Sequence, residues 1–387
     1  MTPVVVVSRR GAERVRAGHP WVYRADVVSA DAAPGDLVRV EGDRGRPIGW
    51  ALWSSTSKIA LRVVATTGEV DEATIWRQRI ERAVGYRASL GIDASACRLV
   101  HGESDGLPGL IVDRYGDCLV VQALCQGADR RLPVFVGVLV EVTGARGIVA
   151  RNDLKVRRLE GLPEAVEVVF GEVPEAVQVT EGPIRYAVDL RHGQKTGLFL
   201  DQRENHEAAA RYGRGRALDA FTYVGGFALR LAAVCDSVDA WDSSASAVAA
   251  AGRHAAANGL GNVVVREANA FDELREREVA GERFDTIVLD PPAFAKNRAA
   301  VPRAVAGYKE INLRALKLLT VGGHLITCSC SAHVDEALLL AIVEAAAADA
   351  RATVTLVEKR MQARDHPVLV GMSETHYLKC LVLRRIA

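Results

Sequence analysis

The stretch Leu218-Asp219-Ala220-Phe221-Thr222-Tyr223-Val224-Gly225-Gly226-Phe227 decides the fold that this sequence predicts. A strand over 217–221 runs into a pair of glycines, and a helix over 226–234 begins at once. Because glycine lacks a Cβ, the backbone there can turn sharply and lie close to a ligand. The loop is therefore either a ligand-binding turn or a tight strand–helix connection that binds nothing.

The same alternation of strand and helix continues to the end of the chain. Further strands are predicted over 237–241, 263–266, 286–289, 324–328, 354–358 and 377–384, and further helices over 245–258, 308–319 and 335–348. This pattern is typical of an open, mainly parallel sheet with helices on both faces. Such sheets bind ligands at the carboxyl ends of their strands, so functional residues are expected there.

The first half of the chain has a different pattern of predicted elements. Turn sequences separate short predicted strands over 4–7, 37–40, 48–53 and 59–64, which indicates a small β-barrel. A mixed segment follows, with helices over 72–90 and 132–142 and strands over 110–112, 118–124 and 166–168. A chain of 387 residues exceeds what one hydrophobic core usually serves, so two or three domains are expected.

The composition, 49% hydrophobic and 25% charged, is that of an ordinary globular protein. No uncharged apolar run reaches the ~18 residues that a membrane span needs, and the N-terminus has valines before arginines, the reverse of a secretory signal. The seven cysteines suggest no disulfide framework and predict reduced thiols. We therefore expect a cytoplasmic protein.

Charge gives a weaker indication of the partner. The net charge is only +1, but residues 1–64 hold ten Lys/Arg against six Asp/Glu. A basic end on a neutral protein favours a polyanionic partner. An ordinary charge-mixed surface explains the same count, and both interpretations stay open at this point.

Polar side chains follow successive strands of the predicted sheet. Asp242 lies 23 residues after Asp219, close to the ~20-residue offset at which an acid meets ribose hydroxyls in nucleotide-binding folds. At the next strand end, the Asn269 amide could pair with an adenine edge and the Phe271 ring could pack on its face. A dinucleotide site would need the spacing G-x-G-x-x-G, which this loop lacks. A nucleoside-type ligand without phosphate fits better.

The fourth strand ends in Asp290-Pro291-Pro292-Ala293-Phe294. Proline fixes φ and offers no amide donor, so the pair predicts a rigid edge beside Asp290, suited to holding one planar nucleobase. The alternative is a loop that is merely rich in proline.

The fifth strand ends in Cys328-Ser329-Cys330-Ser331, and Cys330 falls just beyond the apolar run. Carbon 5 of cytosine is a poor nucleophile until a group adds at carbon 6, and a thiolate does this well. Cys330 is therefore the candidate nucleophile. A small core thiol is the alternative and suits Cys328 better, while Cys-x-Cys without other clustered ligands is poor zinc spacing.

With these motifs in hand, the chain resembles, nearly from end to end, the class I SAM-dependent 23S ribosomal RNA large-subunit methyltransferase I family. These are cytosine-C5 enzymes with an N-terminal PUA domain. The similar segments are 18–23 (GHPWVY), 34–38 (PGDLV), 101–110 (HGESDGLPGL), 157–162 (RRLEGL), 194–203 (QKTGLFLDQR), 365–367 (DHP) and 377–379 (YLK).

The resemblance implies three domains: a β-barrel PUA-like RNA-binding domain over 1–68, a central α+β RNA-recognition domain over 69–185, and a Rossmann-like methyltransferase domain over 186–387. The last would have a mainly parallel seven-stranded sheet and a hairpin or linker over 186–205. The implied partner is 23S ribosomal RNA, with no membrane and no metal, and a homodimer is left open.

The resemblance also implies site residues. S-adenosylmethionine would lie against Phe221, Tyr223, Gly225, Gly226, Asp242, Ser243, Asn269, Ala270, Phe271 and Asp290. Cys330 and Asp290 would be catalytic, and the RNA would contact Lys195, Arg203, Pro291, Phe294 and His366. Asn269 stands where the family usually has an aspartate. It brings no charge, so the affinity for the cofactor is expected to differ from that of the family. No cysteine lies beside Asp290-Pro291-Pro292, which leaves the base that removes the C5 proton unassigned.

Three competing functions remain. An RNA methyltransferase acting on a guanine or adenine nitrogen would use a similar acid-Pro-Pro-aromatic edge, but it would not need Cys330. A non-catalytic RNA-binding assembly factor would keep the fold without the strand-end groups. An NAD-dependent oxidoreductase would need the glycine spacing that is missing here.

Overall fold

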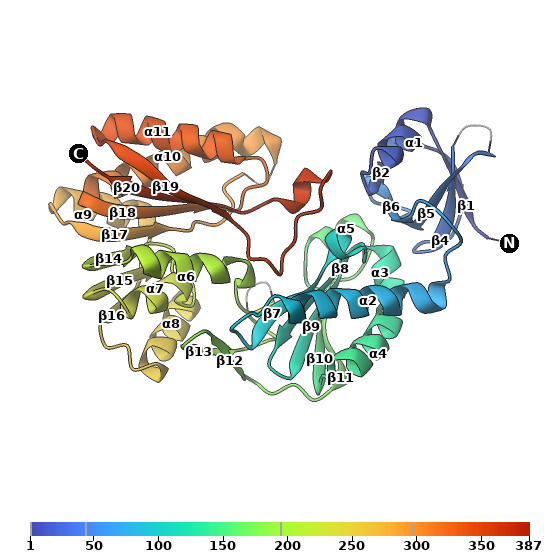
Figure 1. The fold of residues 1–387 in the computed structure, drawn as a ribbon, viewed down its shortest axis with the longest axis horizontal. Helices are drawn as coiled ribbons and strands as arrows, with labels where there is room; N and C mark the ends of the chain where they lie inside the picture. Colours follow the sequence, from blue (N-terminus) through green and yellow to red (C-terminus); the bar gives the residue numbers. More distant parts are fainter. Residues whose placement is uncertain (1, 43–44, 194–195, 296) are drawn as a thin grey trace. The chain divides into compact units, whose positions relative to one another are not determined.

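The computed structural model describes residues 2–42, 45–193, 196–295 and 297–387, and the chain forms two compact units (Figure 1). The first unit comprises Met1–Gly182, Ala187–Leu198 and Arg364–Thr375, and the second comprises Pro183–Tyr186, Phe199–Ala363 and His376–Ala387. Two segments of the predicted methyltransferase domain, 187–198 and 364–375, thus group with the first unit. The predicted boundaries between three domains stay a prediction.

The first unit begins with a six-stranded sheet around a small core. Its strand order is β2 (Trp21–Tyr23), β6 (Ile59–Ala65), β5 (Pro47–Trp53), β4 (Leu37–Glu41), β1 (Val4–Val7) and β3 (Val27–Asp31). Alternate residues such as Val5, Val7 and Val38 are fully buried, as half-exposed strands require. The predicted small β domain is confirmed. Helix α1 (Arg9–Arg16) was not predicted from the sequence, because four of its eight residues are arginines and its one start signal is the N-cap Ser8.

A five-stranded sheet follows in the same unit. Its strand order is β11 (Val166–Gly171), β10 (Gly147–Arg151), β9 (Cys118–Ala123), β8 (Leu110–Tyr115) and β7 (Ala96–His101). Trp76 of α2 (Glu72–Ser89) and Phe135 of α4 (Leu132–Thr143) pack edge to face in its core, with ring centroids 5.7 Å apart. The short helices α3 (Gln126–Arg130) and α5 (Val156–Leu159) and the strand β12 (Val177–Glu181) complete the region. In sequence, β12 is followed by β13 (Ile184–Val188), whose residues are divided between the two units.

The second unit contains the seven-stranded sheet. Its order is β16 (Val263–Glu267), β15 (Ser237–Asp242), β14 (Arg216–Asp219), β17 (Phe284–Leu289), β18 (Leu319–Ser329), β20 (Lys379–Arg385) and β19 (Val354–Met361). The first five strands are parallel, and β20 runs antiparallel to both of its neighbours. The predicted mainly parallel sheet is confirmed. Because β20 is antiparallel, its first residue lies at the edge where the parallel strands end.

Helices cover both faces of this sheet (Figure 1). One face carries α6 (Arg203–Tyr212), α7 (Gly226–Ala232) and α8 (Ala245–Ala257), and the other carries α9 (Ala270–Val279), α10 (Val301–Leu318) and α11 (Glu336–Ala350). In the part of the chain that the structure describes, no helix is long and apolar enough to cross a membrane.

Some elements differ from the sequence prediction. The helix predicted from residue 308 begins at Val301, since Pro302 occupies the first turn, where no amide donor is needed. The strand predicted from residue 324 begins at Leu319, because Gly322 and Gly323 hide the apolar pattern without ending the strand. Helix α6 begins inside the predicted linker, and α9 has too few apolar residues to show a helical period.

Candidate cofactor and catalytic site

The loop after β14 is bonded to both neighbouring strand ends. The Thr222 amide donates to the Trp241 carbonyl at 2.8 Å, and the Ala220 amide donates to the Val288 carbonyl at 3.1 Å. The Tyr223 amide donates to Asp242 Oδ2 at 2.9 Å. The predicted glycine loop and the predicted acid at the end of β15 are therefore in direct contact.

Two residues of this loop have left-handed backbone conformations. Gly225 has φ +98° and tolerates it without cost, whereas Tyr223 has φ +49°, which costs a non-glycine residue on the order of 1 kcal/mol or more. The hydrogen bond to Asp242 and the edge-to-face contact with Phe199, at 4.9 Å between centroids, hold Tyr223 there. Strain of this kind is typical of a ligand-binding turn.

Gly226 lies against a buried histidine. A Cβ at position 226 would come within 2.5 Å of two His206 ring atoms, Cε1 and Nε2. The His206 ring is itself fixed by an edge-to-face contact with Phe227, at 4.5 Å between centroids. Only glycine leaves room for this histidine, so the glycine pair serves packing as well as the sharp turn.

We expect Gly226→Ala to lower the free energy of unfolding by about 1–2 kcal/mol, because the new methyl group overpacks a buried contact. Gly252→Ala is the matched control, since a Cβ at this position within α8 meets nothing within 4 Å. In the control, the free energy of unfolding should rise by roughly 0.5–1 kcal/mol, because alanine has a higher helix propensity than glycine. Urea unfolding measures both, and equal effects of the two substitutions would contradict the packing role of Gly226.

Asp242 is held in one orientation by the backbone. Its Oδ1 accepts the Ser244 amide at 2.9 Å while its Oδ2 accepts the Tyr223 amide, and the adjacent Ser243 is exposed. A carboxylate has about four lone-pair sites, so both oxygens keep acceptor capacity. A rigid, half-buried carboxylate above a strained loop fits the diol of a nucleoside ligand.

The third strand end adds an amide and an aromatic group. Asn269 is exposed and caps α9, with its Oδ1 accepting the Phe271 amide at 3.0 Å, and Ala270 behind it is buried. The Phe271 ring lies 5.9 Å from that of Phe294, which in turn lies 4.6 Å from Tyr308. The structure therefore joins Phe271, predicted for the cofactor, to Phe294, predicted for the RNA base.

Two carboxyls at the ends of β14 and β17 have raised pKa values. Burial, followed by the nearby charge of Asp201, raises the pKa of Asp290 to about 7. Burial raises the pKa of Asp219 to about 6, although its Oδ2 accepts the Ala228 amide at 3.0 Å. Asp290 is thus a carboxyl that exists in both protonation states near neutral pH.

The two cysteines at the end of β18 have different surroundings. Cys328 is fully buried opposite Cys380 of β20, and burial raises the pKa of its thiol. Cys330 is half-buried and lies just past the strand. The next residue, Ser331, is fixed by the Ala295 amide at 3.2 Å and the Tyr308 hydroxyl at 3.0 Å. The strand end that carries Cys330 is thus joined to the loop that follows Asp290.

Among the residues predicted to contact RNA, most point into the protein. Arg203, Pro291 and His366 are buried, Phe294 is half-buried, and Lys195 lies outside the described residues. His366 Nδ1 pairs with Asp365 at 2.9 Å, and its ring contacts that of His101 within the first unit. The RNA-contacting role of these side chains stays a prediction.

Three residues that the sequence analysis did not assign adjoin this site. His206 acts electrostatically on both raised carboxyls, Tyr308 bonds the serines beside Cys330, and Lys379 begins β20. Lys379 had a signal in the sequence, as the last residue of the segment 377–379 (YLK) that carries part of the family resemblance. Among the described residues, no three His, Cys, Asp or Glu side chains are grouped as metal ligands.

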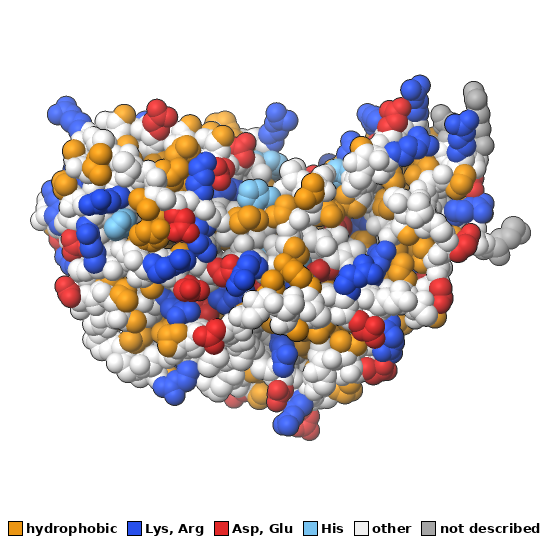
Figure 2. Space-filling view, in the orientation of Figure 1, with side chains coloured by type: hydrophobic (Ala, Val, Ile, Leu, Met, Phe, Trp, Pro, Cys, Tyr) orange, Lys and Arg blue, Asp and Glu red, His pale blue; other side chains and the backbone are white. Residues whose placement is uncertain are grey.

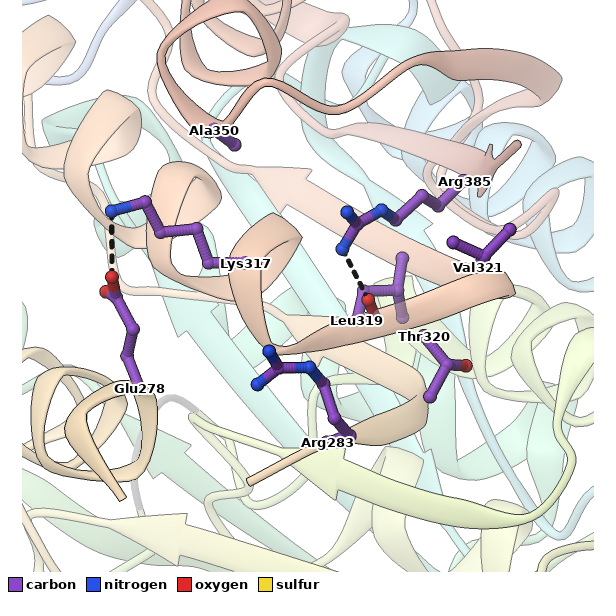
Figure 3. A pocket seen from close by; sticks show the side chains of 8 residues that line it. All are labelled: Glu278, Arg283, Lys317, Leu319, Thr320, Val321, Ala350 and Arg385. Atoms are coloured by element: carbon purple, nitrogen blue, oxygen red, sulfur yellow. Dashed lines mark hydrogen bonds and ion pairs between the residues drawn. The ribbon is translucent and has the colours of Figure 1, made fainter. Parts of the chain in front are cut away.

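Figure 3 shows a pocket near the start of β18, and none of the residues that line it belongs to the candidate site. Its lining residues include Glu278, Lys317 and Arg385, near the start of β18. Lys317 pairs with Glu278 at 2.7 Å, and Arg385 donates to the Leu319 carbonyl at 2.7 Å and to the last turn of α10. Cations at a helix C-terminus compensate the helix dipole, which accounts for Lys317 and Arg385 at the end of α10.

Comparisons with known proteins agree with this geometry. A model of PUA-like domains matches residues 5–66, and a model of S-adenosylmethionine-dependent methyltransferases matches residues 98–384. A Streptococcus mutans protein named as a SAM-dependent methyltransferase superposes with a TM-score of 0.83 at 19% identity, over 99% of this chain and 100% of that one. A methyltransferase crystallised with SAH gives 0.85 at 20% identity, with the same coverage. The superpositions show the fold, and the two family models show that the chain is a SAM-dependent methyltransferase with a PUA-like domain.

Curated relatives show to which family of SAM-dependent methyltransferases the chain belongs. Ribosomal RNA large subunit methyltransferase I of Shewanella amazonensis is 40% identical over 376 residues, 95% of each chain. The protein of the same name from Tolumonas auensis is 37% identical over 397 aligned residues, the full length of both. The chain belongs to the ribosomal RNA large subunit methyltransferase I family.

Proposed function

We propose that this chain methylates carbon 5 of a cytosine in 23S ribosomal RNA through a covalent adduct between Cys330 and carbon 6. The position of Cys330 carries the proposal. It is half-buried and follows β18 directly, and β18 pairs with β17, the strand that Asp290 follows. Methylation of an amino nitrogen needs no thiol at this place, whereas methylation at carbon 5 does.

The chemistry assigns a role to each group. The thiolate of Cys330 forms a bond to carbon 6, and the electron pair of the C5–C6 double bond makes carbon 5 nucleophilic. S-adenosylmethionine supplies the methyl group when bound. Loss of the C5 proton to a base, and expulsion of the thiolate, then restore the aromatic ring and free Cys330.

The Asp290-Pro291 edge suits the cytosine ring. Pro291 is buried and rigid, and the Asp290 carboxyl, with a pKa raised to about 7, can donate as well as accept near neutral pH. A carboxyl that donates to a ring nitrogen would stabilise the electron-rich adduct. The cofactor would lie against the loop of Tyr223, Gly225 and Gly226, with its ribose on Asp242 and its adenine near Phe271.

The RNA assignment comes from the relatives and from the charge of the N-terminal domain. The relatives' names state that they act on ribosomal RNA of the large subunit. Over the face seen in Figure 2, basic and acidic side chains are interspersed and form no broad patch of one sign. Helix α1 has an excess of positive charge, because it carries Arg9, Arg10, Arg14 and Arg16 and a single acid, Glu13. We assign part of the phosphate contact to this helix.

We expect RNA binding to weaken steeply with rising salt, because phosphate contacts release counterions. Arg16→Gln, which removes an exposed charge of α1, should weaken binding a few-fold and reduce the slope of log affinity against log salt by about one. Arg351→Gln, at an exposed position after α11 in the second unit, is the control. Fluorescence anisotropy at several salt concentrations would measure both, and an unchanged slope for Arg16→Gln would remove α1 from the RNA contact.

Product analysis tests the proposed function. The full chain is incubated with a 23S RNA transcript and labelled S-adenosylmethionine, and the RNA is digested to nucleosides for mass spectrometry. The expected product is 5-methylcytidine. Label on a guanosine or adenosine nitrogen would overturn the carbon-5 assignment in favour of the rival methyltransferase, and no transfer to RNA or to ribosomal particles would favour a non-catalytic assembly role.

A further inference from the structure

Lys379 lies at the edge of the sheet where the candidate site is. It is the first residue of β20, and its register partner on β18 is Ser329, the residue before Cys330. Only 2% of Lys379 is exposed. A lysine is almost never buried to this extent unless its ammonium group has specific partners.

The partners of this ammonium are backbone carbonyls. Lys379 Nζ donates to the Ser331 carbonyl at 2.8 Å and to the Tyr377 carbonyl at 2.9 Å. Neither bond supplies a full negative charge to offset the cost of burial, which is several kcal/mol for an unpaired ion. Burial accordingly lowers the pKa of Lys379 to about 8, and the charges of Cys330 and Asp335 oppose that shift.

We propose that Lys379 is a positioning residue for the nucleophile: its ammonium group anchors the Cys330–Ser331 loop and stabilises the thiolate form of Cys330. The proposal rests on the role of Cys330 proposed above. It follows from geometry, since the ammonium group donates to the carbonyl of Ser331, the residue after Cys330, and the register partner of Lys379 is Ser329, the residue before it. An ion pair in a poorly hydrated site is far stronger than one at the surface.

Other titratable groups of the described residues belong to the elements packed at this strand end. Tyr308 of α10 bonds Ser329 and Ser331 at 3.0 Å each, and burial raises the pKa of its hydroxyl, with Cys330 as a further cause. Asp335 caps α11, and Asp290 follows the adjacent strand β17. A buried phenol with a raised pKa stays neutral, so Tyr308 offers no charge to a Cys330 thiolate, whereas the Lys379 ammonium does.

The test measures ionisation of Cys330 directly, without methyl transfer. The full chain is alkylated with iodoacetamide across a pH series, and peptide mass spectrometry follows the rate at Cys330 alone. In the wild type, the midpoint pH of the rise in alkylation rate should lie below the ~8.5 of an ordinary thiol. Lys379→Gln, which keeps a donor but removes the charge, should raise the midpoint by about one unit or more and slow alkylation at pH 7 about tenfold. Lys379→Arg should restore most of the difference.

Lys359→Gln is the matched control, because it removes one lysine charge from β19, where Lys359 pairs with Glu336 at an exposed site. Its midpoint should equal that of the wild type. An unshifted midpoint in folded Lys379→Gln, or an equal shift in Lys379→Arg, would overturn the charge role. Should Lys379→Gln fail to fold, a wild-type midpoint at or above that of an ordinary thiol would overturn it as well. Activity that survives in Cys330→Ala would refute the nucleophile separately, whatever the midpoint.

Discussion

Cys330→Ala is expected to lower the rate of methyl transfer to RNA at least about a thousandfold, because loss of a covalent nucleophile removes the reaction path itself. Binding of S-adenosylmethionine should stay near that of the wild type, since the thiol is assigned to the base and not to the cofactor loops. Single-turnover transfer of labelled methyl groups measures the first effect, and isothermal titration measures the second.

Cys328→Ala is the matched control for this substitution. Cys328 lies two residues away but is fully buried against Cys380, so it cannot reach a substrate. The control should lose some stability, as core truncations do, while keeping substantial activity once folded. An active Cys330→Ala together with an inactive, folded Cys328→Ala would reverse the two roles.

Asp242→Ala is expected to weaken S-adenosylmethionine binding by about 1.5–3 kcal/mol, roughly 10- to 150-fold in dissociation constant. The carboxylate would otherwise accept hydrogen bonds from the ribose, and it also holds the strained Tyr223 through its amide at 2.9 Å. Asp242→Asn keeps one acceptor, so its dissociation constant should lie between those of the wild type and Asp242→Ala. Titration calorimetry at constant ionic strength gives all three constants.

Glu267→Ala controls for loss of charge at the same edge of the sheet. Glu267 is exposed and is the register partner of Asp242 on the neighbouring strand β16. Cofactor affinity should be unchanged in this variant. An unchanged dissociation constant in Asp242→Ala would move the ribose site elsewhere, and circular dichroism checks that the loop substitution leaves the fold intact.

The sequence predicted the sheet of the second unit well, because its strands are apolar runs that alternate with helices. It also predicted which strand ends carry polar groups, since the carboxyl ends of parallel strands meet at one edge. The contact of Tyr223 with Asp242, found in the structure, follows from that rule. Helix α6 was missed because its charged residues, RENHE, show no clear apolar period.

Long-range packing could not be predicted from local patterns. The clash that a Cβ on Gly226 would make with His206 depends on a helix that precedes β14 in the chain. The place of Lys379 depends on β20 running antiparallel, which puts its first residue beside the end of β18. The raised pKa of Asp290 depends on burial and on Asp201, and neither is visible in the Asp-Pro-Pro motif.

The most direct test of the proposed mechanism is covalent trapping with a 23S RNA transcript that contains 5-fluorocytidine. Fluorine replaces the proton at carbon 5 and cannot leave as a cation, so the adduct at carbon 6 should persist after methyl transfer. The proposed mechanism predicts a denaturation-resistant complex that depends on S-adenosylmethionine, with mass spectrometry placing the RNA on the peptide that contains Cys330. Normal methylation of unsubstituted RNA without any trapped complex, or a trapped complex on another residue, would contradict it.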